Sequence, residues 1–96
     1  MNINVGDIVK SKAGRDAGRY FAVWEIRDDS YVTIVDGDLR KVENPKKKKI
    51  KHLAKTEGRL EELMVRKGRS TKILNSDIWN AIKLYEERKE AKKGEV

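Results

Sequence analysis

The sequence contains no cysteine, which excludes disulfide bonds and any zinc site built on thiolates. His52 is the only histidine, so a metal site would need carboxylates alone. The adjacent pairs Asp28-Asp29 and Glu61-Glu62 are of a kind common on solvated surfaces. No set of nucleophile, base and acid can be assembled from the remaining residues. We therefore expect a protein that is not an enzyme and that uses no cofactor and no metal.

Long apolar runs are also missing. No stretch approaches the roughly 18 apolar residues of a membrane span. The N-terminus, MNINVGDIVK, lacks the basic-then-apolar layout of a signal peptide. A chain of 96 residues suffices for one small core with an appendage. These features predict a cytoplasmic, soluble protein with no membrane partner and no small-molecule substrate.

Positive charge is abundant and unevenly placed. The chain has 23 Lys and Arg against 16 Asp and Glu, a net charge of +7. Residues 40–72 hold 13 basic against 4 acidic side chains, whereas residues 1–39 are net acidic. A local excess of this kind attracts polyanions, and in a small protein it favours nucleic acid over a merely solvated charge run.

The first half of the chain has the pattern of short strands separated by turns. Asp36-Gly37 is the strongest hairpin signal, because glycine accepts the positive φ of a two-residue turn. Asn44-Pro45 should end the next strand, since proline cannot donate to a ladder. The expected strands span residues 5–11, 20–26, 31–35, 38–42 and 50–54. Five short strands joined by tight turns predict a mainly β fold, a five-stranded SH3-like barrel.

The second half changes to a helical period. Leu60, Leu63 and Met64 predict a short amphipathic helix that Gly68 ends. A longer helix is predicted by a second apolar stripe with Asn75 or Ser76 and Asp77 as caps; the stripe is Leu74, Ile78, Ala81, Ile82 and Tyr85. From Glu86 onward we expect fraying into a solvated tail. The predicted organisation is a barrel over residues 1–56 and a helical C-terminal extension with a charged tail over residues 57–96.

The loop Lys12-Ala13-Gly14-Arg15-Asp16-Ala17-Gly18-Arg19 joins the first two expected strands. Its two glycines can serve simply as bends in a strand connection. They can also let another chain approach closely, so that exposed backbone N–H groups form a site for phosphate oxygens. The flanking Lys10, Lys12, Arg15 and Arg19 would then supply charged donors.

The run G-D-I-V-K-S-x-A-G-R-D-A-G-R-Y-F-A-V resembles a KOW motif. Together with V-x-I-V-D-G and the basic stretch that follows, it is most similar to bacterial KOW-containing RNA-binding proteins related to a large-subunit ribosomal protein of archaea and eukaryotes. The similarity spans residues 4–54 and places the motif's glycine at Gly18, its preceding loop at residues 13–17 and its apolar positions at Ile8, Val9, Tyr20, Phe21 and Val23. It implies an SH3-like barrel that binds ribosomal RNA.

The lysine run, residues 46–49, follows Pro45 and is expected to form an exposed loop at one end of the barrel. Lysines that meet phosphates release counterions, so their contribution to affinity falls with salt and carries little sequence information. Among the aromatic residues, Phe21 and Trp24 are core candidates and Trp79 is a helix anchor. Tyr20 is the one expected to be partly exposed for base stacking.

Two functions of different classes follow. The first is a non-catalytic RNA-binding protein, associated with the ribosome or its assembly, that uses the glycine-arginine loop and the lysine run. The second is a protein-interaction module of the transcription or translation machinery that uses the barrel surface or the C-terminal amphipathic helix. The candidate RNA-binding residues are Lys10, Lys12, Gly14, Arg15, Gly18, Arg19, Tyr20, Arg40, Lys41, Lys46, Lys47, Lys48, Lys49 and Lys51.

Overall fold

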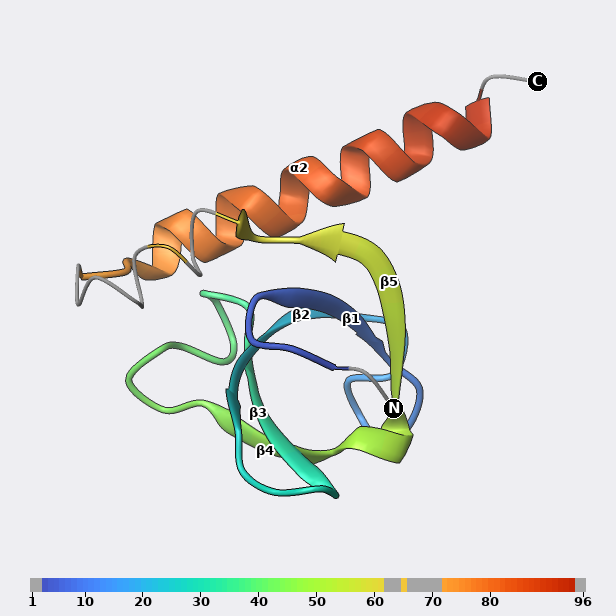
Figure 1. Cartoon of the computed structure of the whole chain (residues 1–96). Coiled ribbons are helices and arrows are strands. Elements are labelled where there is room, and N and C mark those ends of the chain that lie inside the picture. The colour runs from blue at the N-terminus through green and yellow to red at the C-terminus, as the bar shows by residue number, and fades with distance from the viewer. Residues whose placement is uncertain (1–2, 62–64, 66–71, 95–96) are drawn as a thin grey trace.

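The protein is a curved antiparallel sheet covered on one side by a C-terminal helix (Figure 1). The computed structural model describes residues 3–61, 65 and 72–94, with side chains as far as residue 89 in the helix. The sheet has five strands in the order β4-β3-β2-β1-β5, and within the described residues β4 and β5 are its two open edges. The elements are β1 (Asp7–Ser11), β2 (Tyr20–Ile26), β3 (Tyr31–Val35), β4 (Lys46–Lys49), the 3₁₀ turn η1 (Ile50–His52), β5 (Leu53–Arg59) and α2 (Asn75–Gly94).

Both faces of the sheet are buried, because apolar side chains occupy successive positions of its central strands. Ile8 and Val9 are neighbours in β1 and point to opposite faces, since side chains alternate along a strand. One face packs within the curved sheet, where the cluster consists of Ile3, Val9, Phe21, Val23, Val32, Ile34 and Leu53. The other face packs Ile8, Ala22 and Val35 against Ile78 and Ile82 of α2.

The second and third expected strands are confirmed at their predicted bounds, but the strand expected at 38–42 is wrong. Residues 36–45 form an irregular loop instead of a two-residue hairpin. The carboxylate of Asp36 explains the difference, because its Oδ1 accepts the amides of Asp38 and Arg40 at 2.9 Å each. Those amides are therefore unavailable to a ladder. Gly37, with a φ of 81°, lets the start of α2 approach, since a Cβ there would collide with the backbone of Asn75.

The lysine run is a strand and not the expected exposed loop. β4 pairs with β3 through Ile34↔Lys46 and Tyr31↔Lys49, which occupies the outer edge of β3. Lysine is a poor strand former, so pairing with that edge decides the conformation over local propensity. The strand expected at 50–54 is also displaced, because residues 50–52 turn as η1 and β5 follows from Leu53 to Arg59. The expected domain boundary after residue 56 thus falls inside β5.

The helix α2 is longer than predicted. It continues to Gly94, whereas fraying was expected from Glu86. Ile78 and Ile82 of the predicted stripe are buried against the sheet, while Leu74 is 49% exposed. Asp77 caps the first turn by accepting the amide of Leu74 at 3.1 Å. The shorter helix expected around Leu63 lies mostly outside the described residues.

In the ranges that the structure describes, no helix is long and apolar enough to cross a membrane.

Candidate functional site

Asp16 connects the β1–β2 loop to the distant strand β4. Its carboxylate accepts the Ser11 hydroxyl at 2.7 Å and the ammonium groups of Lys46 and Lys48 at 3.0 Å each. Lys48 also donates to the carbonyl of Ala13 at 2.9 Å, so it holds the loop at two points. The glycine-arginine loop and the lysine run, separate in the sequence, therefore form one surface.

The Asp16 carboxylate is ionised throughout the range in which the protein would work. Partial burial by itself would raise its pKa, but hydrogen bonds from Ser11, Lys46 and Lys48 outweigh this effect and hold the pKa well below its ordinary value of 3.8. The single negative charge is shared between Lys46 and Lys48, so the three groups together keep a net charge of +1. The cations free to meet a ligand must lie elsewhere on the surface.

The glycines of the β1–β2 loop act as bends in the strand connection, which was one of the two interpretations of the sequence. Gly14 and Gly18 have φ values of 85° and 89°, which residues with a Cβ rarely adopt. The amide of Gly18 donates to the carbonyl of Ser11 at 2.8 Å, and that of Ala17 donates to Gly14 at 3.2 Å. These two N–H groups are used within the loop and are therefore not available to phosphate oxygens.

A hollow of about 450 Å³ lies between this loop, β4 and the loop that follows β3. Its lining residues are Arg15, Asp16, Phe21, Leu39, Arg40 and Lys46. Three of these are cations and one is the carboxylate already bound by two lysines, so the hollow carries positive charge. Within the described part of the chain, Arg15 has no ion-pair partner.

A second aspartate positions Arg40. Asp36 is 2% exposed and accepts the backbone amide of Arg40 through Oδ1, while its Oδ2 lies 3.3 Å from the guanidinium of Arg19. Arg19 is thus partly engaged inside the protein, although its side chain is 43% exposed. The sequence placed Arg15 and Arg19 together as donors, and the structure distinguishes them: among the described residues Arg15 has no ion-pair partner, whereas Arg19 is held by Asp36.

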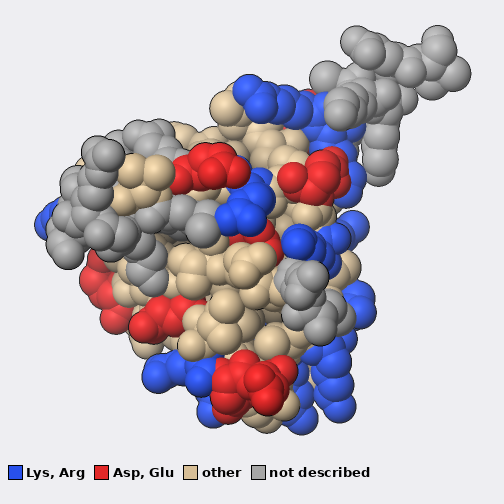
Figure 2. Space-filling view, viewed as in Figure 1, with Lys and Arg blue, Asp and Glu red and all other residues tan. Residues whose placement is uncertain are grey.

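More lysines lie along β4 and η1. Strand alternation directs Lys48 inward, while Lys47 and Lys49 are exposed. Partial burial, together with the positive charges of Lys51, Lys48, Lys49 and Lys12, lowers the pKa of His52. These lysines come from β4, η1 and the β1–β2 loop, so cations from three segments act on one imidazole. Figure 2 shows basic side chains gathered along the right-hand flank, over η1 and β5.

Three predicted residues lie apart from this surface. Lys10 and Tyr20 pair across β1 and β2, on the side facing α2. The Tyr20 ring stacks edge-on with Tyr85 at 5.6 Å, and its hydroxyl accepts Lys89 at 2.9 Å. Tyr20 is partly exposed, as expected, but its ring and hydroxyl are engaged in a contact between sheet and helix. Lys41 is exposed in the loop that touches the start of α2.

The two organising aspartates and Ser11 were not predicted as functional residues. A sequence signal for Asp16 exists, because it is the one acidic residue inside a basic loop with glycines on both sides. Asp36 carries the turn signal Asp-Gly, which pointed to a hairpin. Its role as a buried acceptor depends on the later amides that fold back onto it.

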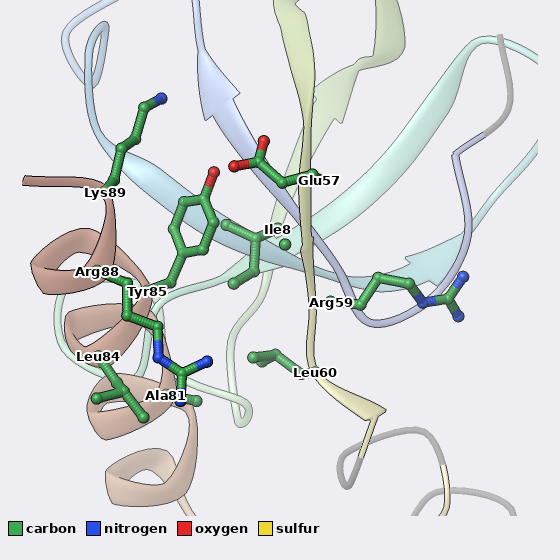
Figure 3. A pocket seen from close by; sticks show the side chains of 10 residues that line it. Ile8, Glu57, Arg59, Leu60, Ala81, Leu84, Tyr85, Arg88 and Lys89 are labelled. Atoms are coloured by element: carbon green, nitrogen blue, oxygen red, sulfur yellow. The ribbon is translucent and has the colours of Figure 1, made fainter. Parts of the chain in front are cut away.

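A different groove, of about 400 Å³, separates β5 from α2. Figure 3 shows Tyr85 reaching from the helix toward β5, beside Ile8. Leu60, Ala81 and Leu84 add apolar walls. The charged residues at this groove include both signs, Glu57 as well as Arg88, so it lacks the uniform positive charge of the first hollow.

Across the described ranges, no group of three or more His, Asp or Glu side chains is placed to hold a metal ion. No protein-family model matches the chain, and no curated protein sequence matches it either.

Proposed function

We propose that the protein is a non-catalytic RNA-binding protein that contacts structured ribosomal RNA through its phosphates, on the ribosome or during its assembly. The binding surface combines the β1–β2 loop, the loop after β3, β4 and η1. Its principal donors are Arg15, Arg40, Lys47, Lys49 and Lys51.

One observation carries this proposal: Asp16 joins the two basic segments into a single surface and is itself neutralised by the lysines it binds. A phosphate approaching the hollow therefore meets Arg15 and Arg40 without an uncompensated carboxylate. Guanidinium groups present paired N–H donors that match the oxygens of a phosphodiester. The exposed lysines nearby would add a sequence-independent attraction.

The strand order supports the finer expectation for the fold. In an SH3-like barrel the first strand lies between the second and the last, and a 3₁₀ turn links the two edge strands. Here β1 lies between β2 and β5, and η1 connects β4 to β5. We propose on this basis that the curved sheet is an SH3-like barrel of the KOW type, with α2 covering one side.

The test is a charge-neutralising double variant, Arg15→Gln with Arg40→Gln. Its matched control is Arg27→Gln with Arg88→Gln, which removes two exposed arginines outside the hollow. Fluorescence anisotropy would measure the affinity for a ribosomal RNA hairpin over a series of KCl concentrations. We expect the plot of log affinity against log salt to become shallower by about two for the first variant. The control should retain a nearly unchanged slope.

Equal slopes in the two double variants would contradict the assignment of the hollow. Failure of the unmodified protein to bind any structured RNA at low salt would contradict the function as a whole. Gradient sedimentation with ribosomal subunits, at low and high salt, provides the cellular counterpart of this measurement.

A second candidate function is protein interaction through α2, and the groove of Figure 3 is the observation that favours it. Leu84 is 50% exposed beside that groove. Most of the helical stripe, however, is already buried against the sheet through Ile78 and Ile82. Leu84→Ser would abolish association with a protein partner and leave RNA binding intact if this function holds.

A further inference from the structure

A third hollow, of about 440 Å³, lies at the opposite end of β3 from the loop containing Arg40. Its lining residues are Asp29, Ser30, Tyr31, Lys49, Ile50 and Lys51. The amide of Ile50 donates to the carbonyl of Ser30 at 2.8 Å, and Tyr31 pairs with Lys49 across the strands. The two sides of the hollow are thus held by backbone contacts. Its volume is within the usual range of small-ligand sites, ~300–1,000 Å³.

The turn that forms one wall leaves a single carboxylate free. Asp28 Oδ1 accepts the amides of Ser30 and Tyr31 at 2.8 and 2.9 Å, and these bonds lower the pKa of Asp28. Asp28 therefore shapes the turn. Its neighbour Asp29 is exposed. Among the described residues it makes no hydrogen bond or ion pair. Asp29 presents two acceptor oxygens at the hollow.

Tyr31 supplies an aromatic surface in the same place. Its ring is half-buried, and the ammonium of Lys47 lies 4.5 Å from the ring centroid in a cation–π contact. Ile50 adds an apolar surface next to it. Tyr20, the aromatic residue favoured from the sequence, is instead engaged by Tyr85 and Lys89. Tyr31 is the tyrosine that borders a hollow with cations on its rim.

We propose that this hollow binds one unstacked guanine nucleotide of a single-stranded RNA segment. The base packs on Tyr31 and Ile50, the Asp29 carboxylate accepts two base N–H groups, and Lys49 and Lys51 contact the flanking phosphates. Guanine is selected because its Watson–Crick edge presents two adjacent donors, N1–H and the 2-amino group. Adenine and cytosine place a ring-nitrogen acceptor beside their amino group, which an ionised carboxylate repels.

This inference deepens the proposed function and rests on it, since the nucleotide would belong to the bound RNA. It adds base discrimination to a surface that otherwise reads only phosphate. The Arg15 and Arg40 hollow and the Asp29 hollow share no lining residue, so each can be disabled separately.

The experiment is a titration of the ¹⁵N-labelled full chain with free nucleotides, followed by amide chemical shifts. GMP should shift the amides of Ser30, Tyr31 and Lys51 in a saturable way. AMP, CMP and UMP should bind at least about fivefold more weakly, the lower end of the discrimination that a bidentate base contact supplies. Inosine monophosphate, which lacks only the 2-amino group, should weaken by a similar factor.

Asp29→Asn should abolish the preference for GMP. The asparagine amide has an acceptor oxygen at one end and an NH₂ donor at the other, so it cannot accept both N–H groups of the guanine edge side by side. Asp29 is exposed, so this variant keeps the fold. Asp38→Asn removes the same charge from an exposed position in a different loop and should leave GMP binding unchanged.

Equal affinity for all four nucleotides, or unaltered GMP binding by Asp29→Asn, would overturn the proposal. These readouts use no structured RNA, so they are independent of the anisotropy test on Arg15 and Arg40. A chain that binds hairpins with the expected salt slope but shows no GMP preference retains the proposed function and loses this site. A chain that prefers GMP but shows equal salt slopes in the two arginine double variants retains this nucleotide site and loses the assignment of the Arg15 and Arg40 hollow.

Discussion

Lys48 and Asp16 form an ion pair of 3.0 Å across 32 positions of sequence, and their side chains are only 8% and 12% exposed. Lys48 is thus a structural residue in the middle of a run of four lysines. The pair determines both the position of the β1–β2 loop and the direction in which the rest of the run faces. The first predictions test these consequences.

Asp16→Asn should destabilise the protein substantially. The substitution preserves the shape of the side chain but leaves the largely buried ammonium of Lys48 without a counter-charge. Removing one member of a nearly buried pair costs roughly 2–4 kcal/mol of unfolding free energy. Urea denaturation followed by circular dichroism would measure it. Asp38→Asn, at an exposed position, should change the midpoint little, and equal midpoints in the two variants would contradict the structural role of Asp16.

The stability of the protein should fall in acid because of the same carboxylate. The folded pKa of Asp16 lies below its ordinary value of 3.8, so the unfolded chain binds the proton more readily. The stabilisation is complete well above that value and is lost as the pH falls from about 5 toward the folded pKa. Urea midpoints measured between pH 7 and pH 2 should show the decline. Asp16→Asn should decline less, whereas a parallel decline would assign the effect to other groups.

Substitutions at odd-numbered and even-numbered lysines of β4 should have different effects, because their side chains lie on opposite faces of the strand. Lys47→Gln with Lys49→Gln removes two outward charges, and we expect weaker RNA binding and a shallower salt dependence with little change in the urea midpoint. Lys48→Gln should instead lower the midpoint, because Asp16 and the Ala13 carbonyl lose a donor. Anisotropy and denaturation on both variants separate the two effects. The reverse pattern would show that the alternation in β4 is wrong.

Two glycines of similar conformation should tolerate alanine very differently. Gly37 and Gly18 have φ values of 81° and 89°, so both substitutions impose backbone strain of about 1 kcal/mol. A Cβ at Gly18 would meet no atom within 4 Å, whereas one at Gly37 would collide with Asn75 of α2. Gly37→Ala should therefore cost at least about 2 kcal/mol more than Gly18→Ala in thermal or urea unfolding. Equal losses would show that α2 does not pack closely on this loop.

The strands Tyr20–Ile26 and Tyr31–Val35 could be predicted at their full bounds because each is a run of aromatic and β-branched residues that ends in turn residues. The buried side of α2 could be predicted equally well, since Ile78 and Ile82 repeat at helical spacing. The β4 strand could not be predicted from the sequence, because four lysines have no apolar alternation and weak strand propensity. Its conformation depends on the edge of β3 and on the carboxylate of Asp16.

Some features of the candidate site could likewise be predicted from the sequence, and others could not. The chemistry of its donors was visible in the sequence, and so was the need for glycine at the bends of the loop. Which cations remain free was not visible, because Arg19, Lys46 and Lys48 are engaged by aspartates at least 17 positions away. The aromatic candidate changed from Tyr20 to Tyr31 for a similar reason, since the contacts of Tyr20 come from α2.

The sequence by itself thus determined the two central strands, the helix with its buried stripe, and the positive charge of the middle segment, because each depends on residues within a few positions of one another. The tertiary structure decided that the lysine run is a strand, that Asp16 and Asp36 organise the basic surface, and that separate hollows border Arg15 and Tyr31. The physical reason is that edge pairing, buried ion pairs and surface hollows are made by segments distant in the chain, and local pattern contains no information about which distant partner each group meets.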